Sequence, residues 1–486
     1  MRHVFTLLIP LIMTLSGHAA TKIKYPGGKH YMYRLTLTDK HDSPYRLEHP
    51  TRWLSPKSIE RRQRQGLKLD STDLPVSPKY LRVIRLQRGI DIIGKSRWNN
   101  TVLILTRDTT EVDVIKQLPF ISKAELVWLS PDSIDKRPRL EKFHDEFNSW
   151  DSVEQERYGL GKEQIEMLNG HRLHELRLTG KGMTIAVLDG GFMNVNRIPT
   201  FAHIKIDGIR DFVWHNPLMP HPGQGDERLF YETDHGTRVL SAMAANTPEV
   251  LTGTAPDAHY WLIRCEDQLT EQPVEQDYWA MSAELADSAG VDVINSSLGY
   301  HAFDQPHRSL EYKELDGQST LISRTASMLA RKGIVLVNSA GNTGMGPWKK
   351  ICVPADAHEI LTVGAINPEG QNAPFSSIGP TQDGRVKPDL MSIGSPATLI
   401  SGRGTIVRDM GTSFSTPVVC GLVACLWQSF PHMSATDIIS LIRKTSDNYQ
   451  TPNNIYGYGK PDFWRAYMMG KLESEEVRSE EVKSEE

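Results

Sequence analysis

Long hydrophobic runs, cysteine and net charge are all scarce in this chain of 486 residues. After residue 20 no stretch is apolar enough to cross a bilayer, so the sequence predicts no membrane span there. The formal net charge is −4, and residues 471–486 account for it, so nothing favours nucleic acid as a partner. The cysteines form no CxxC or Cys/His spacing, which argues against a zinc site and leaves a disulfide open. They are Cys265, Cys352, Cys420 and Cys425.

The one apolar run lies at the start of the chain and has the pattern of a secretory signal. Arg2 and His3 precede an apolar stretch from Val4 to Leu15, and small residues ending at Ala20 follow. The run is too short for a membrane anchor. We therefore expect residues 1–20 to be a signal peptide and the mature protein to be secreted, into either the periplasm or the medium.

Residues 21–130 are predicted to form a small α+β domain. The order β-α-β-β-α-β is typical of a ferredoxin-like arrangement. The charged run Arg61-Arg62-Gln63-Arg64 is interpreted as a solvated helix face. The expected strands are 31–37, 81–86, 101–106 and 122–128, and the expected helices are 56–65 and 110–118.

A polar, charged segment over 131–155 is predicted to be an exposed linker. Residues 156–470 then alternate strands and helices, beginning with the buried strand Met183–Leu188. This alternation predicts an α/β domain with a doubly wound parallel sheet and right-handed crossovers. The tail, 471–486, repeats Ser-Glu-Glu-Val-(Arg/Lys) and is expected to be disordered.

Three short motifs in this larger domain carry reactive side chains. Asp189 ends the strand Met183–Leu188, His235 opens an apolar helix, and Ser413 lies in the turn Gly411–Pro417 before a buried helix. Taken singly, these could be an Asp-Gly turn, an exposed histidine and a helix N-cap. Together they supply what nucleophilic acyl transfer needs, which is a hydroxyl, a base and a carboxylate that orients the base.

The chain order Asp, His, Ser is one of the known convergent orders for such a triad. At this point the sequence resembles the subtilases, the subtilisin-like serine peptidases, over roughly residues 155–468. The departures are mild, since Asp189 is followed by Gly-Gly-Phe and Ser413 by Phe-Ser-Thr. Six blocks carry the resemblance: 184–192, 235–245, Gly253–Ala258, Ser297–Gly299, Ala340–Asn342 and Gly411–Pro417.

The resemblance implies a role for each matching residue. Ser413 would be the nucleophile, His235 the general base and then acid, and Asp189 its orienting partner. Asn342 would donate its amide to the oxyanion, together with the backbone N–H of Ser413. Ser297, Leu298 and Gly299 would pair with the substrate backbone as an added strand.

The main pocket for a substrate side chain would lie between Ser297–Gly299 and a second wall segment. It is expected to be neutral, with no carboxylate, and to favour an apolar residue before the cut bond. Cys352 would form its floor, unless it is only a core thiol. The second wall consists of Ser339, Ala340 and Gly341.

The resemblance also implies partners. The 21–130 domain would be a prosegment that assists folding and then blocks the cleft as an intramolecular inhibitor, with an accessory domain as the alternative. We expect protein or peptide substrates, a monomer, and no cofactor. A structural calcium ion is left open, although the sequence has no clear calcium-loop pattern.

Two other functions were weighed. A lipase-like α/β-hydrolase needs Gly-x-Ser-x-Gly and the order Ser, acid, His, and both requirements fail here. An inactive subtilase that serves as a peptide-binding module would lack a triad residue, whereas all four catalytic positions are filled.

Overall fold

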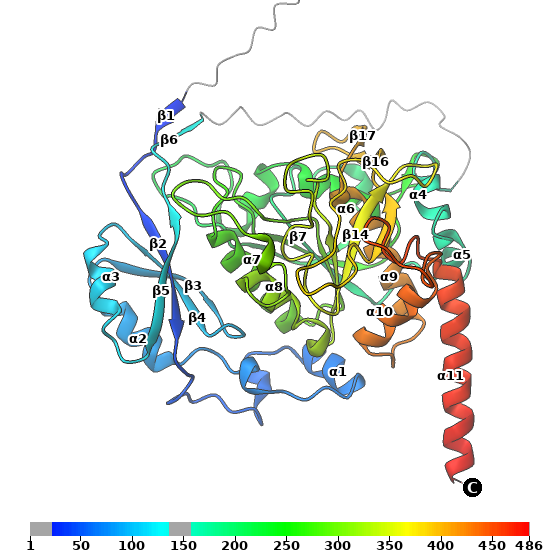
Figure 1. The fold of residues 1–486 in the computed structure, drawn as a ribbon, viewed down its shortest axis with the longest axis horizontal. Coiled ribbons are helices and arrows are strands. Elements are labelled where there is room, and N and C mark those ends of the chain that lie inside the picture. Colours follow the sequence, from blue (N-terminus) through cyan, green and yellow to red (C-terminus); the bar gives the residue numbers. More distant parts are fainter. Residues whose placement is uncertain (1–21, 136–156, 486) are drawn as a thin grey trace, which may run out of the picture.

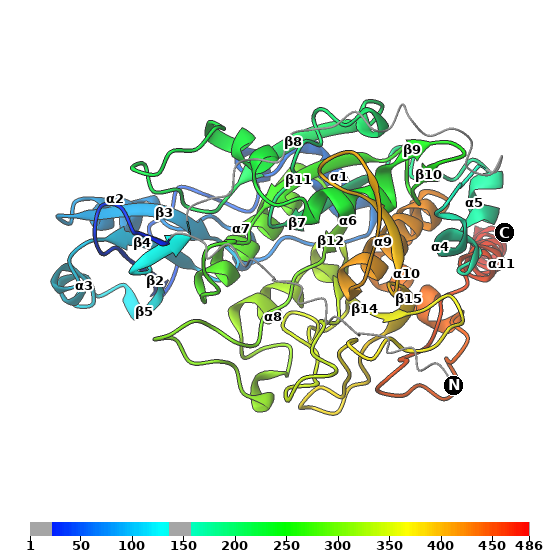
Figure 2. The ribbon, with the colours of Figure 1, turned by 90° about the horizontal axis from the view of Figure 1, so that it is seen from above.

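The computed structural model describes residues 22–135 and 157–485. The predicted signal peptide and most of the predicted linker lie outside these residues. An N-terminal domain and a larger α/β domain stand side by side (Figures 1 and 2). Among the described residues no helix is both long and apolar enough to cross a membrane.

The N-terminal domain is built on a four-stranded antiparallel sheet in the order β3-β4-β2-β5. This order is that of the predicted ferredoxin-like arrangement. A separate strand pair, β1 (Lys22–Lys24) and β6 (Ser133–Asp135), joins the two ends of the domain. The sheet strands are β2 (Tyr31–Leu37), β3 (Ile90–Ser96), β4 (Thr101–Thr106) and β5 (Ile121–Leu129), and the helices are α1 (Pro56–Arg64), α2 (Pro78–Arg85) and α3 (Thr110–Ile115).

One predicted strand of this domain was wrong. Residues 81–86 belong to helix α2, and the strand that was missed is β3. Leu81 and Ile84 are the buried residues of α2, and their spacing of three is that of a helix face. Pro78 at the first turn also starts a helix without losing a hydrogen bond.

The larger domain contains a wholly parallel sheet, as predicted, and this sheet has seven strands in the order β15-β14-β13-β12-β7-β11-β8. Every residue of β7 is buried, as expected for a sheet covered on both faces. The strands are β7 (Thr184–Asp189), β8 (Lys205–Asp211), β11 (His259–Arg264), β12 (Val293–Ser296), β13 (Val335–Ser339), β14 (Leu361–Ile366) and β15 (Leu390–Ile393).

Helices cover both faces of this sheet (Figure 2). Residues of α6 and α9 share one hydrophobic core, and residues of α7 and α8 share the other. The helices are α4 (Lys162–Glu166), α5 (Gly170–Glu175), α6 (His235–Ala244), α7 (Val274–Ala289), α8 (Leu321–Ala326), α9 (Thr412–Gln428), α10 (Ala435–Lys444) and α11 (Phe463–Glu485). Two short hairpins complete the fold: β9 (Asn246–Thr247) with β10 (Leu251–Thr252), and β16 (Ala397–Ile400) with β17 (Ile406–Asp409).

The second core cluster is continuous across the two domains. It contains Met32 and Leu103 of the N-terminal sheet together with Tyr278 and Met281 of α7. This contact explains why every residue of β4 is buried, on both faces of the sheet. Gly94 of β3 allows the close approach, because a Cβ there would lie 2.5 Å from the Met281 sulfur.

Two further predictions were wrong. Arg61 and Arg62 are 2% and 3% exposed, so they do not form a solvated face. The tail is helical, since α11 continues to Glu485 and projects away from the body (Figure 1). Glutamate, lysine and arginine are good helix formers, so a helix can extend here without burying an apolar face.

Candidate active site

The four residues predicted to be catalytic meet at the carboxyl edge of the parallel sheet. Asp189 is the last residue of β7, and Asn342 follows β13. His235 is the first residue of α6, and Ser413 is the second of α9. Open α/β sheets build their sites at this edge, because the loops that leave parallel strands converge there.

Ser413 is held by a helix that runs through the core. All residues of α9 from Thr412 to Trp427 are buried, and Ser413 itself is 8% exposed. At this first turn the backbone N–H groups have no partner within the helix. The positive end of the helix dipole therefore faces the reacting oxygen.

Asp189 and His235 form a hydrogen-bonded pair. His235 Nδ1 lies 2.8 Å from Asp189 Oδ1, and this oxygen also accepts the Gly190 N–H at 2.8 Å. The residue after the histidine must be small, because a Cβ on Gly236 would lie 2.3 Å from the Gly191 carbonyl oxygen. Close packing of α6 against the loop that follows β7 thus explains the His-Gly pair.

Ser413 is not hydrogen-bonded to His235 in the described structure. Its hydroxyl donates instead to the Ser297 carbonyl oxygen at 3.2 Å. A rotation about the Cα–Cβ bond of Ser413 would redirect the hydroxyl. Bonds of this kind are often loose until substrate binds.

Asn342 is oriented by Thr412, the residue that precedes Ser413. Its Oδ1 accepts the Thr412 N–H at 2.9 Å and the Thr412 hydroxyl at 3.0 Å. With the carbonyl end fixed in this way, the amide NH₂ is turned away from Thr412. It is thereby available as a donor beside Ser413.

The charge of Asp189 controls the protonation of His235. Burial lowers the pKa of His235, but the Asp189 carboxylate and its hydrogen bond raise it more, to about 9. The pair is thus built to stabilise an imidazolium, which is the form that a general base reaches after it takes a proton.

A cleft of about 660 Å³ opens at this site. Of the seven residues predicted to bind substrate, six line it: Ser297, Leu298, Gly299, Ser339, Gly341 and Cys352. The seventh, Ala340, is fully buried in the core. Burial raises the pKa of the Cys352 thiol to about 12, so this residue is a neutral part of the wall.

The absence of a carboxylate from the pocket between the two wall segments stays a prediction, but the cleft that contains this pocket also has acidic residues in its lining. Glu266 and Glu271 line the same cleft as Ser413. Burial, together with a neighbouring carboxylate in each case, raises the pKa of Glu266 to about 7 and that of Glu271 to about 8. Both residues follow the carboxyl end of β11, and that position is the signal that sequence reasoning could have used.

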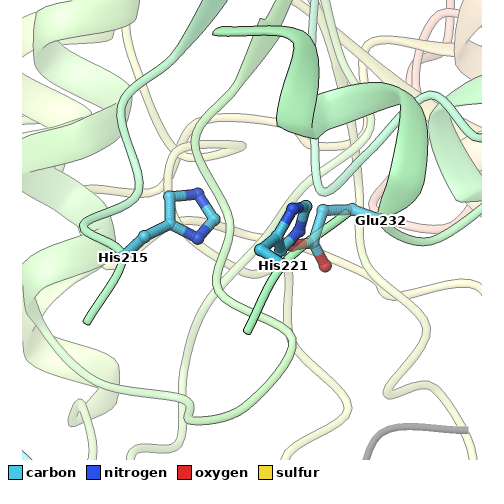
Figure 3. A group of neighbouring side chains, drawn as sticks. All are labelled: His215, His221 and Glu232. Carbon is cyan, nitrogen blue, oxygen red and sulfur yellow. The ribbon is translucent and has the colours of Figure 1, made fainter. Parts of the chain in front are cut away.

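A group of three side chains near β8 has the composition of a metal site: His215, His221 and Glu232 (Figure 3). Their ligand atoms lie within 4.8 Å of one another. However, His215 Nε2 is 2.7 Å from Asp211 Oδ2 and 3.1 Å from Arg264 Nη1, and His221 Nε2 is 2.9 Å from Glu232 Oε1. Because the buried Arg264 guanidinium already supplies positive charge here, we interpret this group as an ion-pair network that does not need a metal ion.

The same arginine connects that network to the site. Arg264 Nε donates to the Gly190 carbonyl oxygen at 2.9 Å, directly after Asp189. Its Nη1 lies 3.3 Å from both carboxylate oxygens of Asp211. The network therefore holds the end of β7 in place.

Comparison with known proteins identifies both domains. Residues 180–459 match the model of the "Subtilase family", and residues 32–142 match the model "Peptidase S8 propeptide domain, Bacteroidota". A thermostable alkaline protease of Halalkalibacterium halodurans is 27% identical over 299 residues, which are 61% of this chain and 70% of that protein. An alkaline protease of Alkalihalobacillus alcalophilus is 25% identical over 387 residues, 78% of this chain and 89% of that protein. Among solved structures, MycP1 with its N-terminal propeptide removed has a TM-score of 0.48 and 24% identity, covering 63% of this chain and 96% of that one.

Proposed function

The chain belongs to the subtilase family of serine endopeptidases, and from that premise we propose that Asp189, His235 and Ser413 are its catalytic triad. The observation that carries this proposal is that His235, Ser413 and Asn342 line one cleft, while the buried Asp189 is already hydrogen-bonded to His235. The secreted destination and the self-processed zymogen are part of the same proposal. The signal-like pattern at residues 1–20 supports the first, and the propeptide match over residues 32–142 supports the second.

In this proposal each of these residues has a defined part in peptide hydrolysis. His235 takes the proton of the Ser413 hydroxyl as that oxygen attacks the substrate carbonyl, and Asp189 stabilises the imidazolium that results. The Asn342 amide and the Ser413 N–H donate to the oxyanion. His235 then gives its proton to the leaving amine, and water cleaves the acyl-enzyme by the same steps in reverse order.

Reaction with a fluorophosphonate probe tests this proposal directly, because the probe needs an activated serine. We expect covalent label at Ser413, located by peptide mass spectrometry. Folded, processed protein that takes no label would favour the alternative, a catalytically inactive subtilase that binds peptides.

We expect activity to rise steeply through the alkaline range. His235 acts as a base only when neutral, and its pKa is about 9. Below that pH, kcat/KM should increase about tenfold per pH unit, because the neutral fraction does so. The charged groups that act on His235 are Asp189, Glu266 and Arg238. A profile of kcat/KM from pH 6 to 10 on an uncharged peptide is the measurement, and a plateau already reached at pH 7 would contradict it.

A preference for basic substrate residues should also depend on pH. Glu271 has no hydrogen-bond or ion-pair partner for its carboxylate within the described residues, and it ionises near pH 8. The ratio of kcat/KM between peptides that differ only by lysine or norleucine should therefore rise between pH 6 and 9.

The variant Glu271→Gln should lower that ratio at pH 9 by about fivefold, corresponding to about 1 kcal/mol for a partly solvated charge pair. Glu311→Gln is the control, since Glu311 does not line the cleft. An unchanged ratio in Glu271→Gln would leave the predicted apolar preference as the better description of the pocket.

A further inference from the structure

The N-terminal domain contacts the α/β domain through its sheet and through a second segment. The sheet packs on α7, and the segment, which lies between β2 and α2, extends from the end of α7 along the amino edge of the parallel sheet. We call this segment the arm, residues 55–73, which contains α1 and the short 3-10 helix η2 (Ser71–Asp73). Figure 1 shows α1 beneath the body of the α/β domain, away from the N-terminal sheet.

The arm lies on the amino edge of the parallel sheet, whereas Ser413 lies at its carboxyl edge. Arg61 Nη1 donates to the Val291 carbonyl oxygen at 2.6 Å, just before β12. Gln65 Nε2 donates to the Gly333 carbonyl oxygen at 3.0 Å, just before β13. Gln65 Oε1 accepts the N–H of Ala435, the first residue of α10, at 3.0 Å. The arm thus connects three elements of the α/β domain and touches nothing in the cleft.

A single buried carboxylate of α7 receives three guanidinium groups from the N-terminal domain. Asp287 accepts from Arg61 at 2.6 Å, from Arg62 at 3.0 Å and from Arg97 at 2.5 Å. The side chains of Arg61 and Asp287 are 1% and 0% exposed. Burial raises the pKa of Asp287, but the charges of the three arginines lower it more, to about 2.

A neighbouring pair has the opposite polarity. Here the cation, Lys332, belongs to the α/β domain, and the carboxylate, Asp73, belongs to the arm, with 2.9 Å between them. Their side chains are 4% and 0% exposed. Arg62 bridges the two sites, since it also donates to Asp73 at 3.2 Å. With this arrangement the charges of the arm and of the α/β domain match in only one register. A shift of the arm would place charges of the same sign next to each other.

We propose that the arm is a second attachment site of the N-terminal domain, and that it, more than the sheet contact on α7, keeps this domain bound once the segment between the domains is cut. The surface that receives it is the amino edge around Asp287, Lys332 and Gly333, and the matching partner is a helix that carries adjacent arginines. Release of the domain then requires the arm to leave the amino edge, whatever occupies the cleft. The role of this contact in maturation rests on the proposed zymogen function, whereas the binding of the arm to the amino edge does not depend on it.

The physical basis is the burial of complete ion pairs. Every carboxylate in the network has charged partners, and Arg61 also donates to three backbone carbonyl groups, those of Val291, Lys332 and Asp287. Removal of one partner from such a site leaves an uncompensated buried charge, which is far more costly than the loss of an exposed pair. Buried pairs are also poorly screened by salt. Because the pKa of Asp287 is lowered to about 2, its carboxylate stays ionised at pH values at which an ordinary aspartate is already protonated. Its ion pairs with the arginines therefore persist through that range and are lost only as the pH falls toward 2.

The test uses the full chain with Ser413→Ala, in which a recognition sequence for a site-specific protease replaces residues 141–147. After the chain is cut there, we expect both fragments to elute together in size-exclusion chromatography, in 1 M NaCl at pH 5 as well as at pH 8. The double variant Arg61→Met/Arg62→Met should weaken the association of the fragments at least about 100-fold. The matched control is Arg64→Met on the same helix, because Arg64 is 34% exposed and its one contact, to Asp292, is 3.4 Å long.

Either of two results would overturn the proposal: separation of the unmodified cut chain, or a double variant that stays bound as tightly as the control. If the double variant does not fold, hydrogen exchange on the unmodified cut chain decides. Amides of residues 59–65 should exchange as slowly as those of α7, and fast exchange there would refute the attachment. None of these measurements requires catalysis. They therefore test the attachment of the arm independently of whether the triad assignment is correct.

Discussion

Replacement of Ser413 by alanine is expected to abolish peptide hydrolysis and fluorophosphonate labelling while the fold persists. The hydroxyl contributes one weak bond in the resting site, to the Ser297 carbonyl oxygen, so its loss costs little stability. Catalysis loses its only nucleophile. In subtilisin the corresponding loss lowers turnover by about 2 × 10⁶-fold, and we expect a fall of that order. Casein-type cleavage and probe labelling measure the activity, and circular dichroism measures the fold.

The same variant tests how the N-terminal domain is separated. If cleavage between the domains is carried out by the enzyme itself, Ser413→Ala should remain full length in a host that lacks other proteases. Equal processing of the variant and the parent chain would assign maturation to another enzyme. Near-parental hydrolysis by the variant would show that a different residue is the nucleophile.

Replacement of Asn342 by alanine is expected to lower kcat by about 10²- to 10³-fold with KM nearly unchanged, a magnitude taken from the equivalent donor of subtilisin. The reason is that its amide bonds to the oxyanion mainly in the transition state, so substrate binding loses little. Steady-state kinetics on one peptide substrate separate the two constants.

Thr412→Val provides a graded comparison for Asn342. It removes the hydroxyl that fixes Asn342 Oδ1 but leaves the backbone N–H bond to the same oxygen. Its loss in kcat should therefore be smaller than that of Asn342→Ala. If both variants instead raise KM and leave kcat unchanged, Asn342 holds the substrate and does not stabilise the oxyanion.

The sequence was sufficient to predict a parallel sheet because its central strands β7, β12 and β13 are buried and largely apolar, and end in aspartate or serine. It was not sufficient where a segment is short or its burial depends on a distant element. Val83 and Ile84 favour a strand by composition, yet they lie in α2, where Ile84 packs into the domain core. Arg61 and Arg62 look like surface residues until Asp287, more than 200 positions later, is brought to them.

The residues proposed to be catalytic could be singled out from the sequence because the local geometry demands the residues next to His235 and Ser413. Gly236 is forced by the approach of Gly191, and Thr412 is needed to orient Asn342. Glu266 and Glu271 have no such flanking pattern. Their position after the carboxyl end of β11 indicates the right edge of the sheet, but composition and spacing do not determine the path of that loop into the cleft.

Because α9 is buried in the core, the enzyme should stay active for as long as that core stays folded. The proposed nucleophile, Ser413, belongs to a helix that is almost wholly buried and not to a surface loop. Partial opening of the molecule at its periphery therefore leaves Ser413 in place, and Ser413 is displaced only when the core itself comes apart. Heat inactivation of such an enzyme is governed by the barrier to global unfolding, and its half-life at a given temperature should follow the unfolding rate.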